Sequence, residues 1–205
     1  MPHSPKTGAS EKMGFDSIDE FDMLLGRSIR HFQQLEKLVE IRLHQLVSAS
    51  SSPTGDIADF IALAVSETSF RSKLKLLSAV LNKLPSREEY KANHKVSEKK
   101  NALDSEMLRA KAVVKRLTKL EEDRNRYVHS FWLPLSSQTA STEPVPVIRV
   151  KTKVDPNKSK TITLEEFPIQ SFLSFLNETV EVQEELSQST GRLLGLLNYD
   201  EDKYK

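Results

Sequence analysis

The sequence contains no cysteine and only six glycines among its 205 residues. The absence of thiols excludes disulfides, cysteine nucleophiles and cysteine-based zinc sites, and it fits the reducing environment of the cytoplasm. The chain also lacks a glycine-rich phosphate loop and a Gly-x-Ser-x-Gly motif, which excludes the common nucleotide-binding folds and the serine hydrolases. His31 and His44 lie too far apart along the chain to form a helical metal pair, so we expect neither a metal nor a cofactor.

An excess of one charge and long apolar runs are missing as well. The 30 basic and 29 acidic residues give a net charge of +1, so the chain as a whole does not attract nucleic acid or membrane, and any RNA contact has to be local. No apolar run approaches the roughly 18 residues of a membrane span, and the N-terminus lacks the apolar core of a signal peptide. We therefore expect a cytoplasmic protein that does not contact a membrane.

The composition, with 38% hydrophobic and 29% charged residues, is that of one ordinary globular domain. Residues 1–15 are polar and contain proline and glycine, which indicates a disordered leader. The last residues, 199–205, are expected to fray. The sequence thus predicts a single folded domain over residues 16–198.

Helical spacing of apolar residues dominates this domain. The first helix is expected to begin at Ser17, with Glu20 completing a capping box, and to run to a Ser-rich loop at 48–55. Residues 56–66 could add one or two helical turns, and a second amphipathic helix runs from Phe70 to Leu84, before Pro85. In both helices the apolar positions follow a helical spacing of three or four residues. In the first helix they are Phe21, Leu24, Leu25, Ile29, Phe32, Leu35, Val39, Leu43 and Leu46, and in the second they are Phe70, Leu74, Leu77, Val80, Leu81 and Leu84.

A third long helix is expected over residues 101–131 and a fourth over 164–197. The charged stretch 86–100 is either a solvated connection, which we favour, or a polar extension of the third helix. Residues 146–164 alternate between polar and apolar side chains around a turn, which predicts a β-hairpin. The expected fold class is mainly all-α: a four-helix-type bundle with a β-hairpin inserted before the last long helix.

The hairpin carries the densest group of basic residues in the chain: Arg149, Lys151, Lys153, Lys158 and Lys160. These side chains could steer an RNA backbone, because lysine and arginine neutralise phosphates. They could equally protect an exposed strand edge from aggregation, for which lysine is common. The sequence leaves both interpretations open.

The stretch 120–134, LEEDRNRYVHSFWLP, concentrates the chemistry of the chain at the end of the third helix. Asn125 and His129 are separated by four residues, which places them within about 40° of each other around a helix, and Arg124 is adjacent. Arginine offers a charged fork suited to phosphate, and histidine, with a reference pKa of roughly 6.5, can transfer a proton near neutrality. Such a trio can hold a phosphodiester and move a proton without a metal.

Each of these residues also has a simpler explanation. Arg124 interrupts the apolar series of the third helix, formed by Leu103, Met107, Ala110, Val114 and Leu117 and continued by Val128 and Phe131. It could form an ion pair with Glu121 or with a carboxylate of a neighbouring helix. His129 could cap carbonyl groups at the helix end, where positive charge is favourable.

The motif Arg124-Asn125-Arg126-Tyr127-Val128-His129 resembles the Arg-x4-His signature of the HEPN superfamily, in the form with Asn after the Arg. The segment 69–74, SFRSKL, resembles one that precedes the motif in many such bacterial proteins. In organisation the likeness covers roughly residues 17–198, and in identifiable motif about ten residues. A tyrosine two positions after the histidine, modified by the antitoxin in one toxin branch, is replaced here by Phe131.

The resemblance implies a helical bundle that dimerises so that two motifs face each other, and a metal-independent endoribonuclease of phage defence or a toxin-antitoxin system. Arg124 would then polarise the scissile phosphate, Asn125 hold the geometry, and His129 assist proton transfer, giving a 2′,3′-cyclic phosphate and a 5′-hydroxyl. RNA would be the substrate, and an antitoxin or defence protein would be a possible partner. The further residues expected to bind substrate are Arg126, Lys73, Arg149 and Lys151. Two alternatives stay open: a catalytically silent HEPN-like module that binds RNA, a nucleotide or a protein, and a purely structural scaffold.

Overall fold

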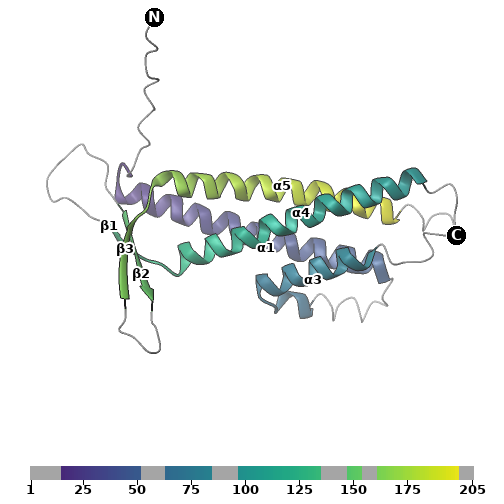
Figure 1. The fold of residues 1–205 in the computed structure, drawn as a ribbon, viewed down its shortest axis with the longest axis horizontal. Helices are drawn as coiled ribbons and strands as arrows, with labels where there is room; N and C mark the ends of the chain where they lie inside the picture. The colour runs from purple at the N-terminus through teal and green to yellow at the C-terminus, as the bar shows by residue number, and fades with distance from the viewer. Residues whose placement is uncertain (1–14, 52–62, 85–96, 135–146, 154–160, 199–205) are drawn as a thin grey trace, which may run out of the picture. The chain divides into compact units, whose positions relative to one another are not determined.

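The computed structural model describes residues 15–51, 63–84, 97–134, 147–153 and 161–198 (Figure 1). Its fold is mainly all-α with a small antiparallel sheet before the last helix, as the sequence predicts. The elements follow in the order α1 (Ile18–Ser51), α3 (Phe70–Lys83), α4 (Ser97–Val128), β1 (Phe131–Pro134), β2 (Val147–Lys153), β3 (Thr161–Glu166) and α5 (Ile169–Asn198). Within the described ranges, no helix combines the length and the apolar character needed to cross a membrane.

The helix starts follow from capping side chains. At the start of α1 the Ser17 hydroxyl accepts a hydrogen bond from the backbone N–H of Glu20 at 3.1 Å, which confirms Ser17 as the N-cap. The Glu20 carboxylate accepts in turn from the backbone N–H of Asp16 at 2.6 Å, one residue before the position used in a standard capping box. At the start of α3 the Ser69 hydroxyl accepts from the backbone N–H of Ser72 at 3.3 Å. Both helices therefore begin where a short polar side chain satisfies free N–H groups.

The chain divides into two compact units. Of the described residues, unit 1 contains 15–29, 126–134, 147–153 and 161–176, and unit 2 contains 30–51, 63–84, 97–125 and 177–198. The long helices α1, α4 and α5 each contribute one part to each unit. Each unit buries apolar side chains of its own.

Unit 2 is an all-helical body whose apolar stripes face one another. Its fully buried side chains include Leu35, Val39 and Leu43 of α1, Leu77 of α3, and Leu117 of α4. Polar contacts tie the helices in pairs. Arg116 of α4 binds three carboxylates of α5, those of Glu178 at 2.7 Å, Glu181 at 3.3 Å and Glu185 at 2.6 Å, and Arg42 of α1 donates to the Ser187 hydroxyl of α5 at 2.9 Å.

Unit 1 is built around aromatic rings. Tyr127 stacks on Phe172 with ring centroids 5.0 Å apart, and Trp132 meets Phe167 edge-on at 5.2 Å. The remaining members of the cluster are Phe15, Phe21 and Phe175. Phe15 is fully buried, so this last residue of the expected leader belongs to the folded unit, and residues 1–14 lie outside the described residues.

The sheet of unit 1 has three strands in the order β1-β2-β3, where the sequence predicts two. The expected hairpin corresponds to β2 and β3, in which Val150 pairs with Leu164; its turn, 154–160, is outside the described residues. The unexpected strand β1 pairs Phe131 with Val150 and Trp132 with Arg149. Because side chains alternate along a strand, Trp132 faces the aromatic cluster while Phe131, on the other face, is 65% exposed.

Several expected boundaries were wrong. Helix α4 begins at Ser97, inside the stretch expected to be a connection, and it ends at Val128, so Phe131 belongs to a strand. The apolar series of α4 ends on Tyr127, which is 8% exposed, whereas Val128 is 37% exposed. Helix α5 begins at Ile169 because the preceding residues pair in β3. Residues 63–66 form the expected helical turn, and 56–62 and 86–96 lie outside the described residues.

Candidate functional site

The end of α4 is fixed by two side chains that follow it. The indole N–H of Trp132 donates to the backbone carbonyl of Tyr127 at 3.0 Å. The hydroxyl of Ser130 donates to the backbone carbonyl of Arg126. Helix ends leave their last carbonyls without partners, and these two bonds satisfy two of them. The capping role considered for His129 is therefore filled, at these carbonyls, by Trp132 and Ser130.

Before this helix end, in unit 2, four polar side chains form a continuous network. Asn125 accepts a hydrogen bond from the Arg124 guanidinium at 3.0 Å and donates through its amide to Glu121 Oε1 at 3.2 Å. The other oxygen of Glu121 accepts from Arg71 Nε of α3 at 3.0 Å. The structure thus brings Arg124 and Asn125 together, as expected, and adds Glu121 and Arg71.

The Arg124 side chain is also held by an aromatic ring. Its guanidinium carbon lies 5.4 Å from the centre of the Phe32 ring of α1, a cation-π geometry. Phe32 in turn packs edge-on against Phe70 of α3 at 4.9 Å. Arg124 therefore follows the apolar series of α4, and its guanidinium is oriented by the Phe32 ring and the Asn125 amide. Among the described residues, no carboxylate forms an ion pair with it, which is the partner that its simpler explanation requires.

His129 is the first residue after α4 and belongs to unit 1, where its side chain is exposed. In the described part of the chain, no hydrogen bond or ion pair engages its ring. Trp132 packs against Phe21, and His129 stays exposed to solvent. An exposed imidazole of this kind is accessible to a bound molecule.

The four expected substrate contacts have different environments. Arg126 is exposed on the last turn of α4. Arg149 is half-buried in β2, with its guanidinium 3.6 Å from the carboxylate of its cross-strand neighbour Glu165. Lys151 is paired with Thr163 in the backbone register, and its side chain lies outside the described residues.

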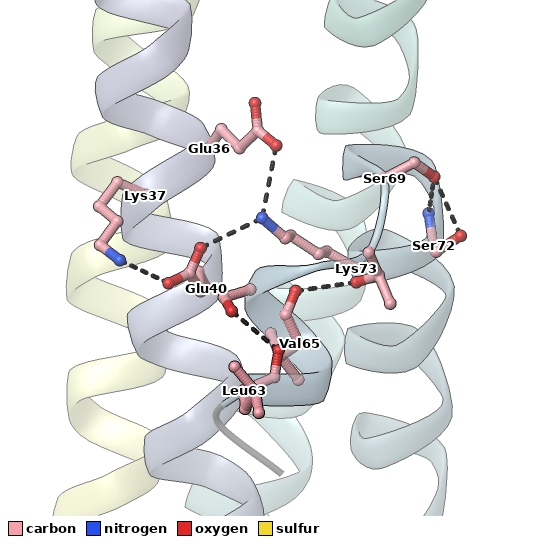
Figure 2. Close-up of polar contacts among 10 residues, drawn as sticks. Glu36, Lys37, Glu40, Leu63, Val65, Ser69, Ser72 and Lys73 are labelled. Carbon is pink, nitrogen blue, oxygen red and sulfur yellow. Dashed lines mark hydrogen bonds and ion pairs between the residues drawn. The ribbon is translucent and has the colours of Figure 1, made fainter. Parts of the chain in front are cut away.

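Lys73 is enclosed in unit 2. Its side chain is 5% exposed, and its ammonium lies 3.1 Å from Glu40 Oε2 and 3.4 Å from Glu36 Oε1, both of α1 (Figure 2). Glu40 is also bound by Lys37, and hydrogen bonds from Lys37 and Lys73 hold the pKa of Glu40 below its usual range against the opposing effect of burial. A lysine so placed ties α3 to α1, and its buried ammonium is occupied by two carboxylates.

Comparison of the chain with models of known protein families, with curated proteins and with solved structures gave no match. Membership of the HEPN superfamily therefore remains a hypothesis carried by the motif. Among the described residues, no group of histidine and carboxylate side chains is arranged to hold a metal ion.

Arg71 is the site residue that sequence reasoning missed. It lies in the segment 69–74 noted for its resemblance, but its partner Glu121 is fifty positions away along the chain. From the sequence alone, Glu121 is expected to be a helix-surface charge or a partner of Arg124 or Arg126. Ser69 marks the start of α3 in the sequence, but this N-cap does not indicate which carboxylate Arg71 contacts.

Proposed function

We propose that the chain is a metal-independent endoribonuclease. Arg124 binds a phosphodiester of RNA, Asn125 fixes the orientation of its guanidinium, and His129 transfers a proton during attack of the 2′-hydroxyl on the phosphorus. The bond between phosphorus and the 2′-oxygen forms, and the bond between phosphorus and the 5′-oxygen of the downstream nucleotide breaks. The proton removed from the 2′-hydroxyl is balanced by the proton that the leaving 5′-oxygen gains, so the products are a 2′,3′-cyclic phosphate and a 5′-hydroxyl. This step is a transesterification, so water is not a reactant, and the proposed mechanism uses no metal ion.

The observation that carries the proposal is the environment of Arg124. A half-buried guanidinium, oriented by an amide and a ring and without a carboxylate partner among the described residues, retains most of its N–H donors for an anion. Arginine forks match phosphate oxygens geometrically and keep their charge at any physiological pH. The exposed ring of His129, five positions later in the chain, supports the proton-transfer part of the proposal.

The proposal includes a homodimer in which both copies contribute their motifs, as the resemblance to HEPN proteins implies. It also includes a role in phage defence or in a toxin-antitoxin pair, with RNA as the substrate and an antitoxin or defence protein as a possible regulator. Sedimentation of the purified chain tests the first part. A monomer at the concentrations at which RNA is cleaved contradicts a composite site.

The mutational test compares three proteins on a labelled RNA in EDTA. We expect the wild-type chain to cleave and His129→Ala to lose roughly a hundredfold or more of the rate, which is the usual contribution of a general acid or base. His31→Ala, which removes a half-buried histidine of α1, is the matched control and should cleave as the wild type does. Equal rates for His129→Ala and the wild type would sink the proposal. Binding of RNA without turnover by the wild type would instead favour a catalytically silent module.

A further inference from the structure

Glu121 is a buried carboxylate located next to the arginine that the proposed function depends on. Glu121 is 7% exposed. It precedes Arg124 by three positions on α4, a spacing at which acidic and basic side chains of one helix readily pair. In the structure it does not pair in this way. One oxygen accepts from Arg71 Nε at 3.0 Å and the other from the Asn125 amide at 3.2 Å.

A buried carboxylate needs a cation or several hydrogen bonds to offset the loss of water. In the described part of the chain, Arg71 of α3 is the cation within ion-pair distance of Glu121. The side chain of Arg71 is itself 55% exposed. If Arg71 were absent, the basic side chain closest along the same helix face would be Arg124. Glu121 would then compete with phosphate for the Arg124 fork.

We propose that Arg71 is a positioning residue of the candidate RNA site: it holds Glu121 and thereby keeps Arg124 available to a phosphodiester. This inference rests on the proposed function. The three charged members of the network, Arg71, Arg124 and Glu121, carry a net charge of +1, which matches the single negative charge of one phosphodiester. Without Arg71 the remaining pair is neutral and has no net attraction for it.

Substitutions at Arg71 and Glu121 should change RNA binding in opposite directions. Arg71→Met should weaken RNA binding roughly tenfold, in keeping with the loss of one charge-assisted contact at Arg124. Glu121→Gln added to Arg71→Met removes the competing charge, so binding should return to within about threefold of the wild type. Arg71→Lys keeps the charge but not the planar guanidinium. Its loss of RNA affinity should lie between the losses of Arg71→Met and of the double variant.

The experiment measures the affinity of the full chain for a fluorescent RNA oligonucleotide by anisotropy in EDTA. The oligonucleotide is 2′-O-methylated, so that it binds without being cleaved. Cleavage of the unmodified RNA is followed in parallel, and the effect of Arg71→Met should fall mainly on KM. The matched control is Arg109→Met, because Arg109 makes a similar ion pair with Glu106 on α4, at 3.3 Å, outside the network.

A purely structural Arg71 would lower thermal stability, but adding Glu121→Gln would not restore RNA affinity. The inference is overturned if Arg71→Met binds RNA as the wild type does, or if the double variant binds as weakly as Arg71→Met. If the wild-type chain binds RNA and either of these results is found, only this inference is overturned. A wild-type chain that binds no RNA overturns the proposed function and the inference together.

Discussion

At the scale of single residues, Trp132 links the end of α4 to the core of unit 1. Its indole N–H caps the Tyr127 carbonyl at 3.0 Å, and its ring packs against Phe21 at 5.4 Å and Phe167 at 5.2 Å. Removing the N–H alone leaves that carbonyl without its partner, which usually costs more than the net value of one hydrogen bond.

Trp132→Phe should therefore lower the free energy of unfolding by about 1–2 kcal/mol, since it keeps a ring and deletes the donor. The measurement is urea denaturation followed by circular dichroism. Phe131→Leu is the control: its side chain is 65% exposed on the opposite face of the sheet, so stability should change by less than about 0.5 kcal/mol. Equal effects of the two substitutions would contradict the assignment of faces.

Glu178 shows how one ion pair makes stability depend on pH. The hydrogen bond from Arg116 holds the pKa of Glu178 below its ordinary range, despite the opposing effect of burial. A carboxyl group with a lowered pKa in the folded state stabilises the fold above the pKa of the unfolded state. That stabilisation is lost as the pH falls through the lowered value.

Glu178→Gln should accordingly destabilise the protein at pH 7 and do so less as the pH falls below about 4.3, the ordinary glutamate value. Thermal denaturation at several pH values between neutrality and acid gives the difference in Tm between the two proteins. A difference that grows toward acid would have the wrong sign and would exclude the Arg116 pairing. Glu184→Gln, an exposed position of the same helix, is the control.

At the scale of elements, the helices could be predicted, and so could both ends of α3 to within one residue, but both ends of α4 and the start of α5 could not. Ser17 and Ser69 mark starts because a hydroxyl caps backbone N–H groups locally. The end of α4 depends instead on β1, whose four residues form a strand only by pairing with β2, more than a dozen positions later. Four residues are too few for an alternating pattern to identify such a strand, so the sequence suggested that the helix continued to Phe131.

Gly26 offers a test of helix α1 as an element. It lies in the helix interior, and an added methyl group would meet nothing within 4 Å. Gly26→Ala should raise the free energy of unfolding by roughly 0.5–1 kcal/mol, because alanine loses less backbone entropy in a helix. Ser17→Ala should act in the opposite direction by about 1 kcal/mol. Denaturant titration distinguishes them, and destabilisation by Gly26→Ala would contradict an exposed glycine at this position.

At the scale of the whole molecule, the candidate site combines a part that the sequence predicts with a part that only the fold supplies. Arg124 and Asn125 are neighbours in the chain, so their contact follows from local spacing. Arg71 and Glu121 meet because α3 packs against α4, and no local pattern determines which carboxylate an arginine of another helix contacts. Lys73 illustrates the converse, since a basic residue expected to bind substrate is buried between two carboxylates.

The most direct test of the central claim is the chemistry of the cleaved ends, measured by mass spectrometry after incubation of the wild-type chain with a short RNA in EDTA. Proton transfer at the 2′-hydroxyl predicts fragments that end in a 2′,3′-cyclic phosphate and begin with a 5′-hydroxyl. It also predicts that the same oligonucleotide with deoxyribose at the cleaved position stays intact. Cleavage of the deoxy substrate, or fragments with 5′-phosphate and 3′-hydroxyl ends, would contradict the account.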